Sequence, residues 1–251
     1  MNSEQNRMHN GAHNSAHNGI HNGARSGAHT ISLRNIWLLS AAVVFLMFAI
    51  SSYAWMQIPA GEEVCTHWNA AGECDDYGSK FVGIYLMPIV TAAVVGLFAL
   101  IPRIDPRAAN IARSRKSYTA VWAAVILFFL ALHTILTLSI LDRDVNIGTY
   151  VPLLVGFMLV AIGNYMGKIR SNYMFGIRTP WTLSSELAWN KTHRLGGKLF
   201  VVEGIIIMAG AIFLQDEWWT YLMLGSIFLM VAVLTGYSYL IWRQDPAIRA
   251  R

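Results

Sequence analysis

The sequence has little charge: only 13% of its 251 residues are Asp, Glu, Lys or Arg, whereas 55% are hydrophobic. A soluble domain carries roughly 25% charged residues, so this composition excludes an ordinary soluble protein. A lipid bilayer as the surrounding solvent explains it. The net charge of +5 could point to nucleic acid, but the basic residues cluster at the ends of apolar runs. We therefore expect no direct nucleic-acid binding.

Enzyme signatures are also missing. The chain has no G-x-S-x-G elbow, H-E-x-x-H helix, phosphate loop or dinucleotide fingerprint, so we expect neither an enzyme nor a cofactor. The first 30 residues have no apolar core followed by a small-residue cleavage pattern. A removable signal peptide is therefore not expected, and the first apolar helix acts as its own insertion signal.

Six segments are apolar and long enough to cross about 30 Å of hydrocarbon as helices, which takes roughly 20 residues. They predict an all-α, polytopic helical membrane protein. Aromatic residues near several segment ends are typical of the membrane interface. The predicted spans run from Ile36 to Met56, Phe81 to Ile101, Thr119 to Leu141, Tyr150 to Gly167, Leu199 to Leu214 and Trp219 to Trp242.

The basic residues predict the orientation, because Lys and Arg are retained on the cytoplasmic side. The two tails and every second connection hold 17 of the 19 Lys and Arg residues. The opposite side keeps only Lys80 and Arg143 and carries most of the acidic residues. We therefore expect both termini in the cytoplasm, with residues 243–251 as a short basic tail.

The N-terminal segment 1–34 is rich in His, Asn and Gly, with His9, His13, His17 and His21 spaced four residues apart. On a helix this spacing would align the imidazoles, so metal capture is one interpretation. The interspersed Asn, Gly and Ser disfavour a helix. A disordered, solvated cytoplasmic tail is therefore the favoured interpretation.

The connection between the first two spans is extracytoplasmic by the charge rule and has more polar and aromatic residues than a turn requires. Gly72 permits a tight turn, and the polar side chains supply donors and acceptors for a compact cap. Its candidate functional residues are His67, Trp68, Asn69, Gly72, Asp75 and Lys80.

A second long connection, from about Asn164 to Lys198, is cytoplasmic by the same rule. Pro180 should interrupt any helix there, and Ser184 or Ser185 can cap a short helix that ends near His193. On that helix, we expect Trp189 to rest on the bilayer surface. A basic topogenic loop would also account for the pattern. Its candidate functional residues are Asn172, Gly176, Arg178, Thr179, Pro180, Trp181, Trp189 and His193.

Both connections resemble a known family. The stretch NYMFGIRTPWTLSSELAWNKTHRLGGK, from Asn172 to Lys198, is similar to the signature of the SdpI-type bacterial immunity proteins. The stretch HWNAAGECDDYGSK resembles the loop of the small membrane domain that often precedes that signature. The resemblance implies a two-helix membrane domain at 35–118 and a four-helix SdpI-like domain at 119–242.

The resemblance also implies a function. Such proteins lie in the bacterial cytoplasmic membrane and protect their cell from a secreted, membrane-active peptide or protein toxin. In the best-known member, the toxin-engaged immunity protein also holds a cytoplasmic transcriptional repressor at the membrane. Toxin capture, exclusion of toxin from lipid and a switched cytoplasmic platform all stay open as mechanisms.

Cys65 and Cys74 stand where the family pattern P-x-H-W-N-x-x-G-x-P-D has proline. Because an extracytoplasmic loop faces an oxidising compartment, we expect a disulfide that replaces the rigidity of the two prolines. A zinc site of both cysteines, His67 and an aspartate is the alternative. Its spacing is not a familiar zinc arrangement and a disulfide would remove both thiolates, so we expect no metal.

Three polar residues, His133, Asn164 and Glu203, fall inside predicted spans, where an ionisable group is a functional candidate. Glu203 lies about 6 Å from the cytoplasmic end of its predicted span, within reach of Lys198 or Asn164. His133 lies roughly 21 Å along its own span, so we expect an interhelical hydrogen bond rather than a proton relay to Glu203.

A transporter is the second functional hypothesis. The three intramembrane polar residues would then form a path for a small solute or ion. Against this hypothesis, the six spans show no obvious inverted repeat and few intramembrane charges. A membrane-embedded hydrolase is a weaker third hypothesis.

Overall fold

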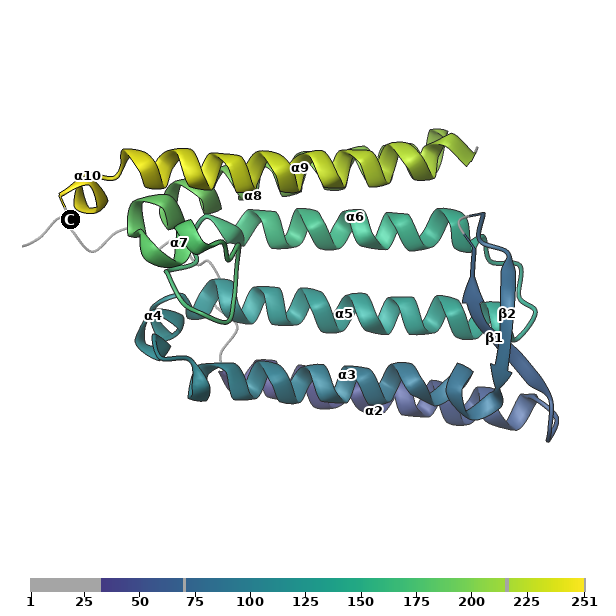
Figure 1. Cartoon of the computed structure of the whole chain (residues 1–251). Coiled ribbons are helices and arrows are strands. Elements are labelled where there is room, and N and C mark those ends of the chain that lie inside the picture. The colour runs from purple at the N-terminus through teal and green to yellow at the C-terminus, as the bar shows by residue number, and fades with distance from the viewer. Residues whose placement is uncertain (1–32, 70, 215–216, 251) are drawn as a thin grey trace, which may run out of the picture. The chain divides into compact units, whose positions relative to one another are not determined.

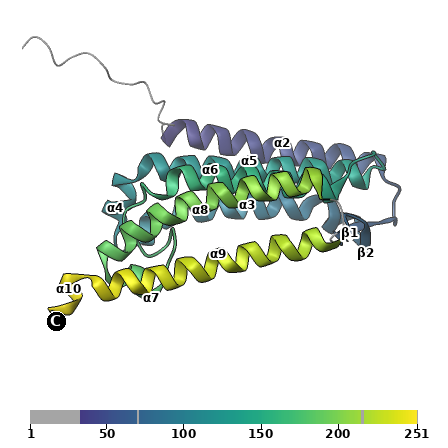
Figure 2. The same ribbon diagram turned by 90° about the horizontal axis from the view of Figure 1, so that it is seen from above.

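The computed structural model describes residues 33–69, 71–214 and 217–250. The segment 1–32, to which most of the His-rich tail prediction applies, lies outside them. Long helices run side by side in both views (Figures 1 and 2). In chain order the elements are α2 (Leu33–Gln57), β1 (Glu63–Trp68), β2 (Cys74–Ser79), α3 (Lys80–Ile104), α4 (Ala108–Arg113), α5 (Arg115–Ile140), α6 (Ile147–Met166), α7 (Pro180–Ser184), α8 (Glu186–Phe213), α9 (Glu217–Gln244) and α10 (Pro246–Arg249).

Among the described residues, six helices are long and apolar enough to cross a membrane, which confirms the predicted polytopic helical membrane protein. Five of them begin and end within four residues of the predicted limits. Their bounds are Arg34–Gln57, Lys80–Ile104, Arg115–Ile140, Ile147–Met166, Glu186–Phe213 and Trp218–Gln244.

The fifth span is the exception, because α8 begins at Glu186 rather than at Leu199. Ser185 caps it, and the Ser185 hydroxyl accepts the backbone N–H three residues further on at 3.0 Å. The predicted short helix that ends near His193 is therefore wrong. His193 lies inside one continuous helix of 28 residues.

Two glycine pairs bring α6 and α8 into backbone contact. A Cβ built on Gly163 would lie 2.7 Å from the carbonyl oxygen of Gly197, and one built on Gly197 would lie 2.7 Å from that of Gly163. Gly156 and Gly204 make the same reciprocal contact, at 2.6 and 2.5 Å. Because the glycines recur seven residues apart on two antiparallel helices, the pairs form one glycine seam.

Aromatic rings hold the N-terminal helices together. The Trp122 ring in α5 stacks on Phe98 of α3 and meets Trp37 of α2 edge-on, each at 5.4 Å between centroids. The Tyr118 hydroxyl donates to the carbonyl oxygen of Phe98 at 2.5 Å. This core includes residues of α2, α3, α4 and α5. It spans the boundary predicted after residue 118, and the division into two membrane domains stays a prediction.

The connection after α2 adds a small sheet to the otherwise helical fold. Strands β1 and β2 pair antiparallel, from Glu63 opposite Ser79 to Trp68 opposite Cys74. The register shifts on either side of His67. This hairpin lies at one end of the helices, whereas α4 and α7 lie at the other (Figure 1).

Replacing Gly163 by Ala tests the glycine seam. We expect a lower thermal unfolding midpoint of the detergent-purified protein, because overpacking a close contact costs about 1–3 kcal/mol. Gly225→Ala in α9 is the matched control, since a Cβ there meets nothing within 4 Å. The control should unfold at or slightly above the wild-type midpoint, because Ala favours a helix over Gly by about 1 kcal/mol. Equal midpoints for the two variants would contradict the seam.

Candidate functional site

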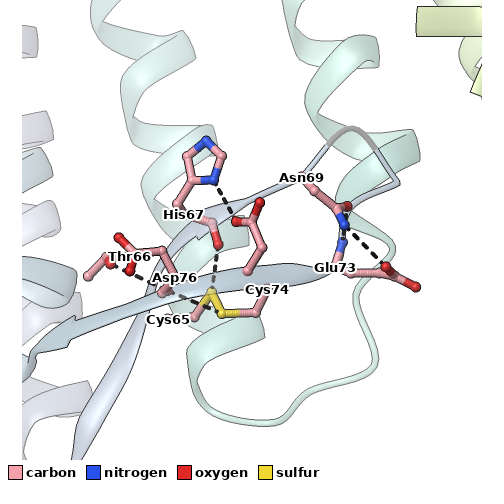
Figure 3. The surroundings of a disulfide bond; sticks show 8 residues. Cys65, Thr66, His67, Asn69, Glu73, Cys74 and Asp76 are labelled. Atoms are coloured by element: carbon pink, nitrogen blue, oxygen red, sulfur yellow. Dashed lines mark hydrogen bonds and ion pairs between the residues drawn. A yellow bond between two sulfur atoms is a disulfide. The ribbon is translucent and has the colours of Figure 1, made fainter.

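The hairpin turn is organised by Asn69 (Figure 3). Its Oδ1 accepts the backbone N–H groups of Ala71 at 2.9 Å and Glu73 at 3.0 Å, and its Nδ2 donates to Glu73 Oε2 at 3.1 Å. Gly72 has a φ of +82°, which disfavours any residue with a Cβ. Asn69 and Gly72 therefore shape the turn itself.

A disulfide joins Cys65 on β1 to Cys74 on β2, with 5.9 Å between their Cα atoms (Figure 3). The bridge leaves no thiolate for the alternative zinc site. Next to it, His67 Nδ1 lies 2.6 Å from Asp75 Oδ1. These two side chains are 66% and 43% exposed, so they form a surface pair.

Two contacts seat the hairpin on the helices. At its turn, a Cβ on Gly72 would collide with the backbone N of Gly148 at the start of α6. At its base, Lys80 Nζ donates to the carbonyl oxygen of Ile58 at 2.5 Å and lies 4.4 Å from the centroid of the Trp55 ring. Lys80 therefore ties the hairpin down instead of extending into solvent.

The hairpin end exposes a mainly acidic surface. Tyr77, on β2, is 61% exposed within it, and Trp68 is half-buried. Arg143, in the α5–α6 connection, is an exposed cation at the same end. The exposed acidic residues are Glu62, Glu63, Glu73, Asp75, Asp76, Asp142 and Asp144.

Thiol labelling tests the disulfide. We expect a maleimide to add to neither cysteine of the untreated, denatured protein and to both after reduction, as read by mass spectrometry. A disulfide that closes a loop of this length stabilises the folded hairpin by about 2–3 kcal/mol, because it restricts the unfolded chain. Loss of the bridge should therefore let the hairpin open more often. A Cys65→Ser/Cys74→Ser variant should therefore show faster amide exchange in β1 and β2. Two free thiols without reductant would disprove the bridge.

The second candidate site, the loop between α6 and α7, folds back onto the helices. Two buried side chains hold its backbone. Asp105, 4% exposed, accepts the N–H groups of Tyr173 and Met174 at 2.9 and 3.0 Å. Asn172, 1% exposed, accepts those of Met174 and Phe175 at 3.1 and 2.6 Å. The loop backbone is therefore fixed from two sides.

The segment between α3 and α5 adds further anchors. Arg107 lies 4.6 Å from the centroid of the Tyr173 ring and donates a hydrogen bond to the Ser171 hydroxyl. Asn110 Nδ2 donates to the Ser171 carbonyl oxygen at 2.8 Å, and the Ser114 hydroxyl accepts a backbone N–H from the start of the loop at 2.9 Å. These contacts make α4 and the loop one structural unit.

His193 of α8 anchors the next turn of the loop. Its Nε2 accepts the N–H of Ile177 at 2.9 Å while its Nδ1 donates to the Trp189 carbonyl oxygen at 2.9 Å, so both ring nitrogens of the neutral side chain are satisfied. The imidazole stacks on the Trp189 ring at 4.0 Å between centroids. Gly176, with a φ of +116°, lies so close that a Cβ would collide with the imidazole.

A short capped helix, α7, ends the loop. Thr179 and Thr182 form a reciprocal capping box, and Pro180 takes the first helical position, where its missing N–H costs nothing. Pro180 thus begins a helix instead of interrupting one. The Trp181 ring packs at 5.2 Å from the Tyr239 ring of α9, which leaves it half-buried.

Trp189 corrects the expectation of an interfacial helix. Its side chain is 0% exposed, and its Nε1 donates to the Ile169 carbonyl oxygen at 2.8 Å. The loop covers this face of α8, so Trp189 cannot rest on the bilayer. Arg178 is the exposed charged residue of the predicted set, and its guanidinium donates to the Tyr173 carbonyl oxygen at 2.9 Å.

The polar residues expected inside the spans do not meet one another. His133 in α5 is 1% exposed, and its Nε2 lies 3.2 Å from both the Met47 carbonyl oxygen and the Ser51 hydroxyl of α2. Asn164 is exposed and donates to the Val160 carbonyl oxygen of its own helix at 2.9 Å. His133 therefore links two helices, while Asn164 contacts its own.

Glu203 has a partner that the sequence did not indicate. The Ser226 hydroxyl of α9 donates to Glu203 Oε1 at 2.6 Å, in place of Lys198 or Asn164. Because α8 begins at Glu186, Glu203 lies about 26 Å along its helix rather than about 6 Å from its start. Glu203 is 5% exposed, and its carboxyl group joins α8 to α9.

Among the anchoring residues that sequence reasoning missed, three differ in the signal that they carried. Asp105 carried a usable signal, because it is the only acidic residue in a connection that is otherwise basic. Arg107 entered the sequence analysis only as one of the basic residues that predict the orientation. Ser226 carried no signal, since nothing distinguishes it from the other serines in apolar segments.

His193→Leu tests the loop anchor. We expect the free energy of unfolding to fall by about 1–3 kcal/mol, because the substitution leaves the part-buried Ile177 N–H without its acceptor. His67→Leu is the control: it removes an exposed imidazole whose surface pair is worth only about 0–1 kcal/mol. Thermal unfolding in detergent compares the two. If the unfolding midpoint of His193→Leu equals that of the control, His193 does not anchor the loop.

Comparisons with known proteins match both candidate sites. Residues 168–238, which hold the loop and α7, match the SdpI/YfhL protein family, and residues 42–92, which hold the hairpin, match a domain of unknown function, DUF1648. The chain is 28% identical over 207 residues to the immunity protein SdpI of Bacillus subtilis (strain 168), across 80% of this chain and 93% of the relative. No solved structure matches. The resemblance found in the two loop motifs is confirmed.

Proposed function

We propose that this multi-pass membrane protein, with its SdpI/YfhL family region, is an immunity protein of a bacterial cytoplasmic membrane that protects against a secreted, membrane-active peptide or protein toxin. One observation carries the proposal: an immunity protein aligns with the chain over 93% of its own length, and both candidate sites lie in regions matched by family models. The similarity therefore extends to the residues that could meet a partner.

Charge supports an orientation for the two sites. The hairpin end exposes mainly carboxylates, whereas the α4–α7 end gathers cations, which are retained in the cytoplasm. The hairpin then faces the toxin outside, and the loop and both termini face inward. The exposed cations at the α4–α7 end include Arg103, Arg113, Arg115, Lys116, Lys168, Arg170, Arg178, Lys191, Arg194 and Lys198.

The internal hydrogen bonds of the loop support a rigid platform. Asn172 uses its polar atoms on the loop backbone, and His193 uses its ring nitrogens on the backbone of the loop and of α8, so neither is available to a partner. Arg178 is exposed and Trp181 is half-buried on the same segment. A cytoplasmic partner such as a transcriptional repressor would therefore contact these two side chains.

The transport alternative gains no support from the placement of its residues. His133 lies between α2 and α5, Glu203 lies between α8 and α9, and Asn164 is exposed. A polar path for a solute or ion through the described helices would need these three polar groups to line the same cavity.

Survival under toxin challenge tests the proposal. The gene is deleted in its own bacterium and restored as wild type, Arg178→Ala, Trp181→Ala or Lys191→Ala, with equal membrane levels confirmed by immunoblot. We expect wild type to restore survival and resting membrane potential, and Arg178→Ala and Trp181→Ala to lose protection. Lys191→Ala removes an equal charge from an exposed position of the same end and should protect.

Three outcomes would count against the proposal. The first is a deletion strain that survives every candidate secreted peptide at the same rate as the parent strain, because the deleted protein then gives no immunity. Equal protection by all variants would remove the loop from the mechanism. Solute uptake that is lost in Glu203→Gln, with survival unchanged, would favour transport.

A further inference from the structure

One residue, Ser185, forms the junction between α7 and α8. Its backbone N–H donates to the Trp181 carbonyl oxygen at 3.1 Å, and this bond ends α7. Its hydroxyl oxygen accepts the N–H of Ala188 at 3.0 Å, and this bond begins α8. Ser185 is 4% exposed, so the junction is buried. The position of this one residue therefore sets where α7 lies relative to α8.

The carboxylate of Asp245, directly after α9, holds this junction. Its Oδ2 accepts the Ser185 hydroxyl at 2.5 Å. Its Oδ1 accepts the N–H of Ala247 at 3.0 Å, a local turn that orients the carboxylate at the start of α10. The carboxylate thus lies at the N-terminal end of α8, where the helix dipole favours a negative charge. Both carboxylate oxygens of Asp245 are fixed.

Burial of Asp245 is more than a short basic tail requires. The residue is 7% exposed, and removing a carboxylate from water is costly unless hydrogen bonds replace the water. Among the described residues, no Lys or Arg forms an ion pair with Asp245, so its substitution leaves no buried cation behind. Its one described side-chain hydrogen bond outside its own turn goes to Ser185. The α7–α8 junction is therefore what this carboxylate stabilises.

The last turns of α9 hold α7 from the same side. Ser238 is 0% exposed, and its hydroxyl lies 3.0 Å from the hydroxyl of Thr179, which caps α7. The Tyr239 ring packs edge-on against the Trp181 ring. Ser238, Tyr239 and Asp245 thus contact the start, the middle and the end of the α7 segment. The C-terminal end of α9 and the residue after it form the seat of α7.

We propose that Asp245 is a positioning residue of the cytoplasmic site, which fixes the α7–α8 junction through Ser185 and thereby sets the position of Trp181 for a partner. The inference rests on the proposed function, in which Arg178 and Trp181 meet a cytoplasmic partner. It extends the site beyond residue 238, where the match to the SdpI/YfhL family ends, into a segment that the sequence predicts only as a basic tail.

Amide hydrogen exchange of the full chain in detergent tests the contact. Asp245→Ala removes the acceptor of the Ser185 hydroxyl, so we expect several-fold faster exchange in peptides that cover α7 and the first turn of α8, with β1 and β2 unchanged. Glu186→Ala is the matched control, because it removes an exposed carboxylate from the same end of α8. Unchanged exchange in α7 of Asp245→Ala, or an equal rise in the control, would overturn the proposal.

A double-mutant comparison separates this contact from a general loss of structure. In a Ser185→Ala background the hydroxyl is already absent, so adding Asp245→Ala should raise exchange in α7 little further. A rise as large as that in the wild-type background would show that Asp245 does not act through Ser185, and the proposal would be wrong.

Survival of the deletion strain under toxin challenge tests the consequence. At equal membrane levels, Asp245→Ala should lower survival to that of Trp181→Ala, whereas Glu186→Ala should protect as wild type does. Asp245→Asn keeps a carbonyl oxygen that can accept the Ser185 hydroxyl, so it should protect better than Asp245→Ala. Equal loss in the Asn and Ala variants would contradict the hydrogen bond as the cause.

The survival measurement also distinguishes this inference from the proposed function. A wild-type gene that gives no survival advantage contradicts the proposed function, whatever the exchange rates are. Protection by wild type and by Asp245→Ala, with none by Trp181→Ala, contradicts the positioning role alone.

Discussion

Backbone contact between α6 and α8 is the constraint on which both candidate sites depend. The glycine seam lets the two helices approach until each carbonyl oxygen faces the partner's Cα, and any side chain would separate them. At one end of the pair, Gly148 of α6 supports the hairpin turn. At the other end, Trp189 and His193 of α8 hold the loop. One helix pair thus positions a site on each side of the membrane-spanning region.

The outer helices join this pair through different chemistry. In lipid, apolar side chains gain little by leaving hydrocarbon, so close packing and polar bonds decide which helices associate. The hydroxyl of Ser226 binds Glu203 and the Trp219 ring packs on Gly210, which together hold α9 to α8. His133 links α5 to α2. The main role of the few polar residues inside the spans is therefore to hold helices together.

Apolar length predicted the fold well, and its one failure has a physical cause. Five spans were placed within four residues because a helix that faces lipid along its whole length must be apolar along its whole length. The first turns of α8 face the loop instead of lipid, so their sequence is polar. Hydropathy therefore placed the start of the helix too late. The cap at Ser185 marks the start of α8, although the sequence analysis gives this cap to a separate short helix that ends near His193.

The candidate sites were predicted as residue sets but not as networks. Asn172, Gly176, Trp189 and His193 were identified from one contiguous motif, yet the Asp105 carboxylate that binds the same loop lies 68 residues before Tyr173 in the chain. Such a contact depends on how helices pack, which a motif does not encode. The hairpin was easier to anticipate, because its turn residue, its glycine and its cysteines lie within one short stretch.

The split between buried and exposed motif residues limits what a loss of function can mean. A substitution at Asn172 or His193 removes an internal contact of the loop, and a side chain at Gly176 would collide with the His193 imidazole, so each alters the shape of the whole platform. Arg178 differs, because its side chain is exposed and its one described hydrogen bond goes to a carbonyl at the surface of the loop. Since a partner can recognise only what the folded loop presents, the recognition chemistry of this end rests on exposed Arg178 and the Trp181 ring, with the buried motif residues acting through the shape they impose.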